Sequence, residues 1–180
     1  MQVRILYRVR QFWRTVFVKN DKQALAQARD RLTPGQWVLF TQMQPAEQGH
    51  ALRMFRLLID QGENQPDLLV AALLHDVGKL RYQLNPFERA VVVVIKTLLP
   101  EMACRWGELP EVGWDGLPGL RKAFILARQH PAWGAELARK AGVSVMAEEL
   151  IRQHQQSPAR GSDDWKSSLH YKLWAVDNDF

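Results

Sequence analysis

The 180-residue chain has a single cysteine, Cys104, and no apolar run long enough to cross a membrane. One cysteine excludes an internal disulfide bond, so we expect a protein of the reducing cytoplasm, with Cys104 as a small buried side chain. The apolar run at residues 90–95 ends at Lys96, and like every other apolar run of the chain it falls far short of the roughly 20 residues that span a bilayer. Arginines interrupt the apolar residues of the first 14 positions, which is unlike a secretory signal.

Acidic residues are few at the N-terminus: residues 1–31 hold eight Lys and Arg but only two Asp. This segment carries a net charge of +6, which leaves −1 for the other 149 residues. The positive charge of the whole chain therefore does not predict that the remaining 149 residues bind nucleic acid. Because aromatic residues alternate with the arginines, the segment could lie on an anionic membrane surface or bind RNA. We favour a helix that packs its aromatic side chains on the rest of the chain.

The pattern of apolar residues predicts an all-α protein. Apolar side chains recur at helical spacing along almost the whole chain, and the alternation typical of strands is absent apart from residues 91–95. We expect one helical bundle, residues 33–180, preceded by a basic helical extension, residues 1–32. A loop rich in proline and glycine is expected at residues 108–119. The predicted helices of the bundle and its approach cover residues 22–32, 34–43, 45–59, 66–75, 86–104, 121–129, 131–141, 143–154 and 169–176.

The most informative stretch is an apolar helix, starting near Asp67, that ends in His75-Asp76-Val-Gly78-Lys79. Adjacent side chains on a helix point about 100° apart, so His75 and Asp76 reach one ion only where the helix ends. We expect Gly78 to let the chain turn sharply there. An imidazole with a carboxylate suits Fe, Mn, Zn or Mg. The alternative is that His75 is a satisfied buried histidine and Asp76 a helix cap.

The other histidines favour the metal site over that alternative. The sequence resembles the HD-domain superfamily of metal-dependent phosphohydrolases, in particular its stand-alone members with an HDIG-type motif. The pattern of that superfamily is a histidine, a His-Asp pair about 25 residues later, two further histidines and a closing aspartate. The resemblance covers roughly residues 33–180. The matching residues in this chain are His50, His75, Asp76, His130, His154 and Asp177.

The resemblance implies two divalent metal ions, with Fe or Mn favoured and Mg, Zn, Co or Ni also compatible. One ion is expected on His50, His75, Asp76 and Asp177. Asp76 is expected to bridge to a second ion, which His130 and His154 complete. Asp179, two positions after Asp177, is a rival for the last ligand. His170 has no place in the pattern, and we expect it to serve packing or the surface.

The activity that the resemblance implies is hydrolysis of a phosphate ester in a nucleotide-like small molecule by a metal-activated hydroxide. Asp76 and Lys79 are the expected catalytic residues, with Lys79 and Arg53 as candidates for binding the substrate phosphate. Phosphomonoesters, phosphodiesters and dinucleoside polyphosphates all remain open as substrates.

Two departures from known members of the superfamily narrow this range. Gln153 precedes the fourth histidine and no Gly-Tyr-Pro string follows it, which disfavours cyclic-di-GMP. The separation of 54 positions between Asp76 and His130 is longer than expected for the small hydrolases of dinucleoside polyphosphates. The alternative functions are an HD-type diiron oxygenase and a regulatory module that binds a metal or nucleotide.

Overall fold

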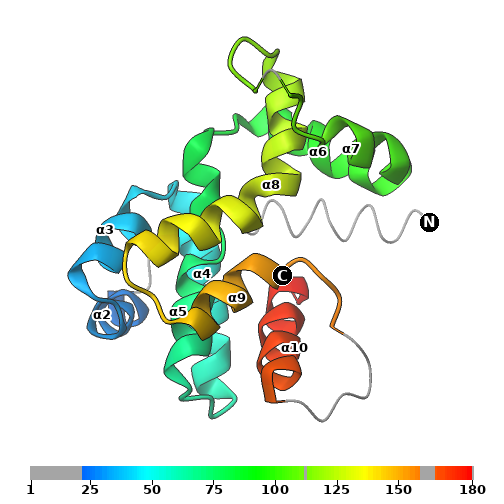
Figure 1. The fold of residues 1–180 in the computed structure, drawn as a ribbon. Helices are drawn as coiled ribbons and strands as arrows, with labels where there is room; N and C mark the ends of the chain where they lie inside the picture. The colour runs from blue at the N-terminus through cyan, green and yellow to red at the C-terminus, as the bar shows by residue number, and fades with distance from the viewer. Residues whose placement is uncertain (1–21, 112, 159–164, 180) are drawn as a thin grey trace.

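The computed structural model describes residues 22–111, 113–158 and 165–179, and every regular element in these ranges is helical (Figure 1). The absence of strands from the described ranges confirms the predicted all-α class. The β-branched run at residues 91–95 is helical as well. The elements are α2 (Lys22–Arg31), α3 (Pro34–Gln42), α4 (Pro45–Asp60), α5 (Pro66–Leu74), the 3₁₀ helix η1 (Val77–Arg81), α6 (Pro86–Leu98), α7 (Pro100–Trp106), α8 (Gly119–Lys140), α9 (Val145–Gln153) and α10 (Trp165–Asn178).

The apolar helix α5 is the central element of the larger core (Figure 1). A helix that is apolar on all sides is stable only when other elements surround it, and α2, α3, α4, α9 and α10 all contact α5. Its leucines and alanines from Leu68 onward are buried. The C-terminal end of α5 therefore delivers the next residues, His75 and Asp76, into the interior of the bundle.

Helix α2 belongs to the same packed unit as α4 and α5. Ala24, Ala28 and Leu32 lie in the main core, and α2 contacts both helices. The predicted boundary between an extension and a bundle, at residues 32 and 33, stays a prediction. Most of that extension, residues 1–21, lies outside the described ranges. The hypotheses that its basic segment packs on the chain, lies on a membrane or binds RNA therefore stay predictions.

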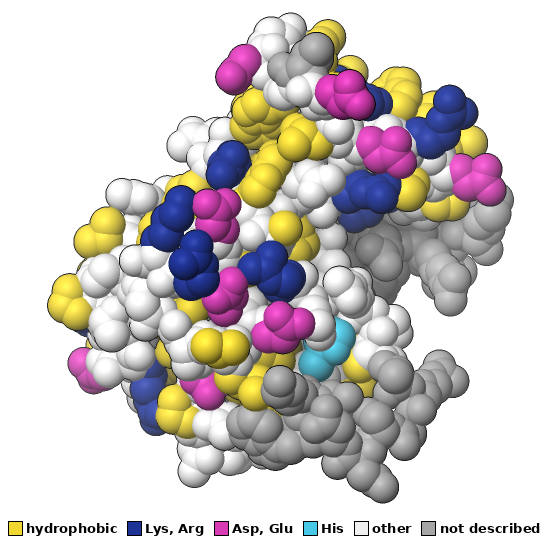
Figure 2. Space-filling view, viewed as in Figure 1, with side chains coloured by type: hydrophobic (Ala, Val, Ile, Leu, Met, Phe, Trp, Pro, Cys, Tyr) yellow, Lys and Arg dark blue, Asp and Glu magenta, His cyan; other side chains and the backbone are white. Residues whose placement is uncertain are grey.

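A smaller core joins α6, α7 and the first half of α8 at one end of the molecule (Figure 1). It consists of Val92, Ala103, Ala123 and Phe124, with partly buried neighbours. Figure 2 shows apolar side chains at the surface of this end, with basic and acidic side chains between them. Phe87 of α6 is 68% exposed. The α6–α7 end is therefore covered less completely than the main core.

The prediction of one helix over residues 86–104 is wrong. Helix α6 ends at Leu98 and α7 begins at Pro100, with Leu99 between them at φ −135° and ψ 62°. A residue that precedes proline is disfavoured in the helical conformation, and proline suits the first position of a new helix. Pro100 thus carried the signal for this break.

The predicted break between residues 129 and 131 is also wrong, because α8 runs through Pro131. A proline inside a helix removes one hydrogen bond and costs about 3 kcal/mol. Burial of His130, Pro131, Gly134 and Ala135 offsets this cost. Smaller differences occur at α9, which begins at residue 145 behind its cap Ser144, and at α10, which is longer than the predicted 169–176.

Among the described residues, no helix combines the length and the apolar character that a membrane span requires. The expected burial of Cys104 is wrong, because its side chain is exposed on α7. Only Ala103 of α7 is buried, so the neighbouring position faces outward. There the Cys104 sulfur lies 2.6 Å from Nη1 of Arg128.

Candidate metal centre

His75 and Asp76 lie where α5 gives way to η1. His75 caps α5, and Asp76 has left the helical conformation, with φ −94° and ψ 2°. This change in backbone direction brings two adjacent side chains together, with His75 Nε2 3.4 Å from Asp76 Oδ2. His75 is 1% exposed and Asp76 is 3% exposed. A buried imidazole and a buried carboxylate therefore lie side by side at the end of the apolar helix.

Gly78 serves close packing rather than a sharp turn, contrary to our expectation. It lies within η1 and is not among the glycines with positive φ. A Cβ atom at Gly78 would lie 2.0 Å from the carbonyl oxygen of His130 and 2.7 Å from the amide nitrogen of Gly134. The absence of a side chain therefore lets η1 touch the backbone of α8, which carries His130.

The first group of candidate ligands joins α4, the end of α5 and α10. His50 Nε2 lies 2.9 Å from Asp177 Oδ1, and His75 Nε2 lies 3.8 Å from the same oxygen. One ligand atom of each residue lies within 4.8 Å of the others. Asp179, the rival for the last position, is exposed and belongs to neither group of candidate ligands. The geometry therefore selects Asp177.

The second group joins Asp76 to α8 and the end of α9. His130 Nε2 lies 3.2 Å from Asp76 Oδ1 and 3.3 Å from His154 Nε2. All three residues are buried. The two oxygens of Asp76 thus face different groups, Oδ2 toward His75 and Oδ1 toward His130. This arrangement suits a carboxylate that bridges two ions.

Three of these histidines are oriented by their own helices. In each, Nδ1 lies at hydrogen-bond distance from a backbone carbonyl three or four residues earlier. A carbonyl only accepts, so Nδ1 donates, and Nε2 is left to face the cluster. Ligating histidines are commonly fixed in this way. The three bonds are His75 to Ala72 (2.9 Å), His130 to Leu126 (3.0 Å) and His154 to Ile151 (2.8 Å).

Charge is distributed unevenly among the histidines. Burial disfavours the imidazolium of His75, but the carboxylates of Asp76 and Asp177 outweigh burial and raise its pKa to about 9. Burial, reinforced by His75 and His130, lowers the pKa of His154 to about 3. Burial also lowers the pKa of His130. The cluster therefore favours one positive charge between the carboxylates and keeps the other two imidazoles neutral.

Two features of the cluster fit divalent metal ions. His75 Nε2 is buried and makes no hydrogen bond among the described residues, although Asp76 Oδ2 lies 3.4 Å away. The neutral His130 and His154 direct two Nε2 atoms at each other, and neither carries a proton to share. One ion with bonds of about 2.0–2.1 Å, 90–110° apart, would place two imidazole nitrogens roughly 2.8–3.4 Å from each other. The observed separation of 3.3 Å lies in that range. The donor set of imidazoles and carboxylates suits Fe, Mn or Zn.

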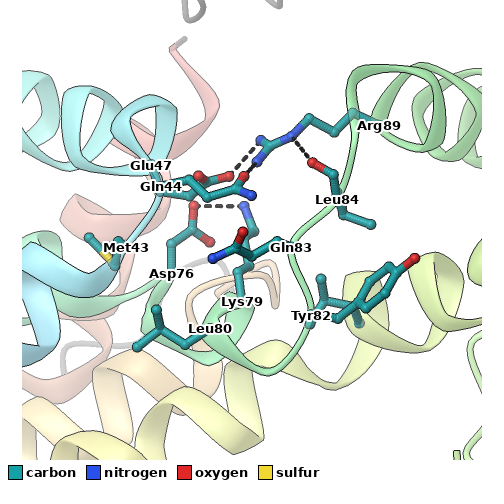
Figure 3. A pocket seen from close by; sticks show the side chains of 11 residues that line it. Met43, Gln44, Glu47, Asp76, Lys79, Leu80, Tyr82, Gln83, Leu84 and Arg89 are labelled. Atoms are coloured by element: carbon teal, nitrogen blue, oxygen red, sulfur yellow. Dashed lines mark hydrogen bonds and ion pairs between the residues drawn. The ribbon is translucent and has the colours of Figure 1, made fainter. Parts of the chain in front are cut away.

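Lys79 lies beside this cluster and pairs with it. Its Nζ lies 2.7 Å from Asp76 Oδ2, at the edge of a pocket in which both residues are lining side chains (Figure 3). Burial would raise the pKa of Asp76, but Lys79 and then His75 hold it well below its usual range. The side chain of Lys79 is 29% exposed. A cation is thus available between the candidate ligands and the solvent.

Sequence reasoning missed the far wall of that pocket, which Glu47, Gln44 and Arg89 form (Figure 3). Arg89 Nη1 lies 2.5 Å from Glu47 Oε1, and its Nη2 donates to Gln44 Oε1. Glu47 is 3% exposed. One signal was present: Glu47 precedes His50 by three positions, which places both on the same side of α4.

Two other predicted or noted residues lie outside these groups. Arg53 is partly buried on α4, one turn after His50, and burial lowers its pKa. It does not line the pocket of Figure 3, and its role in substrate binding stays a prediction. His170 donates through Nε2 to the carbonyl of Gln153, at 2.8 Å, and so covers the end of α9.

The long loop before α8 packs against η1. Trp114 lies edge-on to Tyr82 and to Trp133, with ring centroids 6.0 and 5.1 Å away. Arg81 lies over the Trp133 ring at 4.9 Å. The loop therefore covers the outer side of the segment that follows the His-Asp pair.

Comparison with known proteins gives no further guide: no family model matches the chain, and no curated protein or solved structure matches it either.

Proposed function

We propose that the cluster of His50, His75, Asp76, His130, His154 and Asp177 is a dinuclear metal centre that hydrolyses a phosphate ester. The observation that carries the proposal is the direction of the imidazoles. In three buried histidines Nδ1 donates a hydrogen bond to a backbone carbonyl, and Nε2 faces the cluster with its two carboxylates. A merely structural histidine gains most when both of its ring nitrogens are hydrogen-bonded within the protein. In contrast, His75 Nε2 has no such partner among the described residues.

Each of the two groups would hold one ion. His50, His75 and Asp177 would hold one ion, His130 and His154 the other, and Asp76 would contact both. Two ions at such a site supply a nucleophilic hydroxide near neutral pH and neutralise the charge of the phosphoryl oxygens. The protein contributes the burial, which strengthens every electrostatic interaction at the centre.

Lys79 has the place and the charge for a phosphate-binding residue. Its ammonium lies against Asp76 and is partly open to solvent, so a phosphate bound on the solvent side of the centre would lie near this side chain. An ammonium beside a phosphoryl oxygen stabilises the charge that develops during hydrolysis. This supports a phosphorylated small molecule as the substrate, and a nucleotide is the class that the motif implies.

The direct test is metal analysis of the purified full chain, followed by assays with phosphomonoesters, cyclic nucleotides and dinucleoside polyphosphates in the presence of Mn²⁺ or Fe²⁺. We expect about two ions per chain and turnover of at least one ester. Asp76→Asn should lose both properties. Glu136→Gln, a surface carboxylate variant with the same charge change, should keep them.

Other results would redirect the proposal. Bound iron with O₂ consumption and no ester hydrolysis would indicate the oxygenase alternative. Metal or nucleotide binding without any turnover would indicate a regulatory module. A folded protein that binds no metal would refute the metal centre itself.

A further inference from the structure

Glu47 carries a carboxylate oxygen that no described residue binds. Its Oε1 pairs with Arg89, but Oε2 is buried and has no hydrogen-bond partner within the described ranges. The whole side chain is only 4% exposed. A buried charged acceptor without a donor is costly, and native structures rarely retain one without a reason. The free oxygen therefore points to a donor that binds it in another state of the protein.

Lys79 is a donor that lines the same pocket (Figure 3). Its Nζ now binds Asp76 Oδ2, but its flexible four-carbon stem allows other positions. Burial would lower the pKa of Lys79, but the charge of Asp76, and after it that of Glu47, raises it. Glu47 thus already attracts this ammonium.

The carboxylate of Asp76 cannot pair with Lys79 and bind a metal ion through the same oxygen. The oxygen that Lys79 contacts at 2.7 Å, Oδ2, is also the one that faces His75. A divalent ion on Asp76 would lie close to the ammonium, and two cations so near each other repel strongly in a buried site. Loading the centre therefore favours departure of Lys79 from Asp76, and a nearby acceptor would lower the cost.

On the basis of the metal centre proposed above, we infer that Glu47 Oε2 receives Lys79 when metal binds. The lysine then has two positions: Asp76 in the metal-free protein and Glu47 in the loaded one. Arg89 fixes the receiving carboxylate, because it holds Oε1 and is itself held by Gln44 and by the carbonyl of Leu84. Glu47 is a positioning residue, which keeps the ammonium beside the centre and off its bridging ligand.

A double-mutant cycle on Mn²⁺ affinity tests this inference without any substrate. Calorimetric titration of the metal-free full chain would compare wild type, Glu47→Gln, Lys79→Met and the double variant, with circular dichroism to verify folding. Glu47→Gln should weaken Mn²⁺ binding about tenfold, the size of one charge-assisted hydrogen bond. In the Lys79→Met background the same change should alter affinity less than about twofold. Glu136→Gln is the control for loss of one carboxylate charge.

An equal loss in both backgrounds would overturn the inference, because Glu47 would then act on the ions directly rather than through Lys79. If Glu47→Gln does not fold, a crystal structure of Mn²⁺-loaded wild type decides, with Lys79 Nζ expected at Glu47 Oε2. Nζ on Asp76 or directed to solvent in that crystal would overturn it. A wild type that binds no Mn²⁺ would instead refute the proposed function, so the two failures are distinguishable.

Discussion

Three of the four histidines of the cluster depend on a backbone carbonyl close to them in the sequence. The Nδ1 bonds of His75, His130 and His154 span only three or four residues, so they form together with the local helical backbone. What the rest of the fold adds is the meeting of these Nε2 atoms at the two oxygens of Asp76. A change at one histidine should therefore affect one group of ligands more than the other.

His154→Ala should reduce the bound Mn²⁺ from two ions per chain to one. The variant removes a ligand of the second group and leaves His50, His75, Asp177 and the bridging Asp76 in place. Equilibrium dialysis followed by elemental analysis measures the stoichiometry. His170→Ala is the matched control, because His170 contacts the backbone of α9 rather than the cluster, and it should retain two ions. Unchanged stoichiometry in His154→Ala would contradict the assignment of the second group.

The end of an apolar helix pointed to His75 and Asp76, and the order and spacing of the histidines along the chain predicted the other candidate ligands, which the structure places in two groups. The pocket beside them could not be predicted from the sequence. Gln44 and Arg89 lie 45 positions apart, and their contact depends on how the start of α6 lies against α4. No periodicity encodes that placement. Glu47 was the exception, since its spacing from His50 already placed both on one side of α4.

At the scale of elements, the contact of η1 with α8 holds the two ligand groups in register. Gly78 packs against the backbone of His130 and Gly134, and a Cβ at Gly134 would lie only 3.1 Å from the Gly78 amide nitrogen. His130 precedes Gly134 by one turn of the same helix. Any side chain at this contact separates Asp76 from His130, which must stay together for a bridging carboxylate.

Gly78→Ala should destabilise the protein by about 3 kcal/mol, because the new methyl group would overlap the backbone of His130. For a chain of this size the melting temperature should fall by roughly 6–12 °C, and Mn²⁺ affinity should fall with it. Thermal denaturation followed by circular dichroism measures the first effect. Gly35→Ala is the control, since its Cβ would meet Ala141 at an ordinary 3.6 Å. Equal stability of the two variants would argue against the close contact.

The two helix boundaries that sequence reasoning misplaced both involve proline, with opposite outcomes. Pro100 begins a new helix, because the chain leaves the helical conformation at Leu99 and α7 then packs against α6. Pro131 is carried inside α8, because the residues around it are buried. Both prolines disfavour a helical conformation at the residue before them, and tertiary packing overrides this preference only at Pro131. A single sequence does not predict that packing, whereas it did predict the all-α class and most helix positions.

At the scale of the whole molecule, a metal that binds only the folded chain must stabilise it. At free Mn²⁺ of about 100 times the dissociation constant, the gain is about 2.7 kcal/mol. Removing metal with a chelator should therefore lower the melting temperature by roughly 5–10 °C, and Mn²⁺ should restore it. Differential scanning calorimetry measures the shift. Asp76→Asn serves as the control and should show no response to either addition.

The two cores should differ in local stability. The α6–α7 end is held by a small cluster of buried apolar side chains, whereas α5 is surrounded by the main core. Amide hydrogens of residues 86–106 should therefore exchange faster than those of residues 66–74, as measured by mass spectrometry. Mn²⁺ should slow exchange near residues 66–81 and leave α6–α7 almost unchanged. Uniform exchange across both ends would show that the chain opens as one unit.

The short-range bonds that orient the histidines also make this cluster portable. Because each imidazole takes its direction from a carbonyl of its own helix, no separate set of side chains is needed to orient three of the ligands. A protein engineer could graft the helical segments that carry His75, His130 and His154 onto another helical scaffold. The scaffold would have to reproduce only the relative placement of those helices and the glycine contact that lets two of them touch.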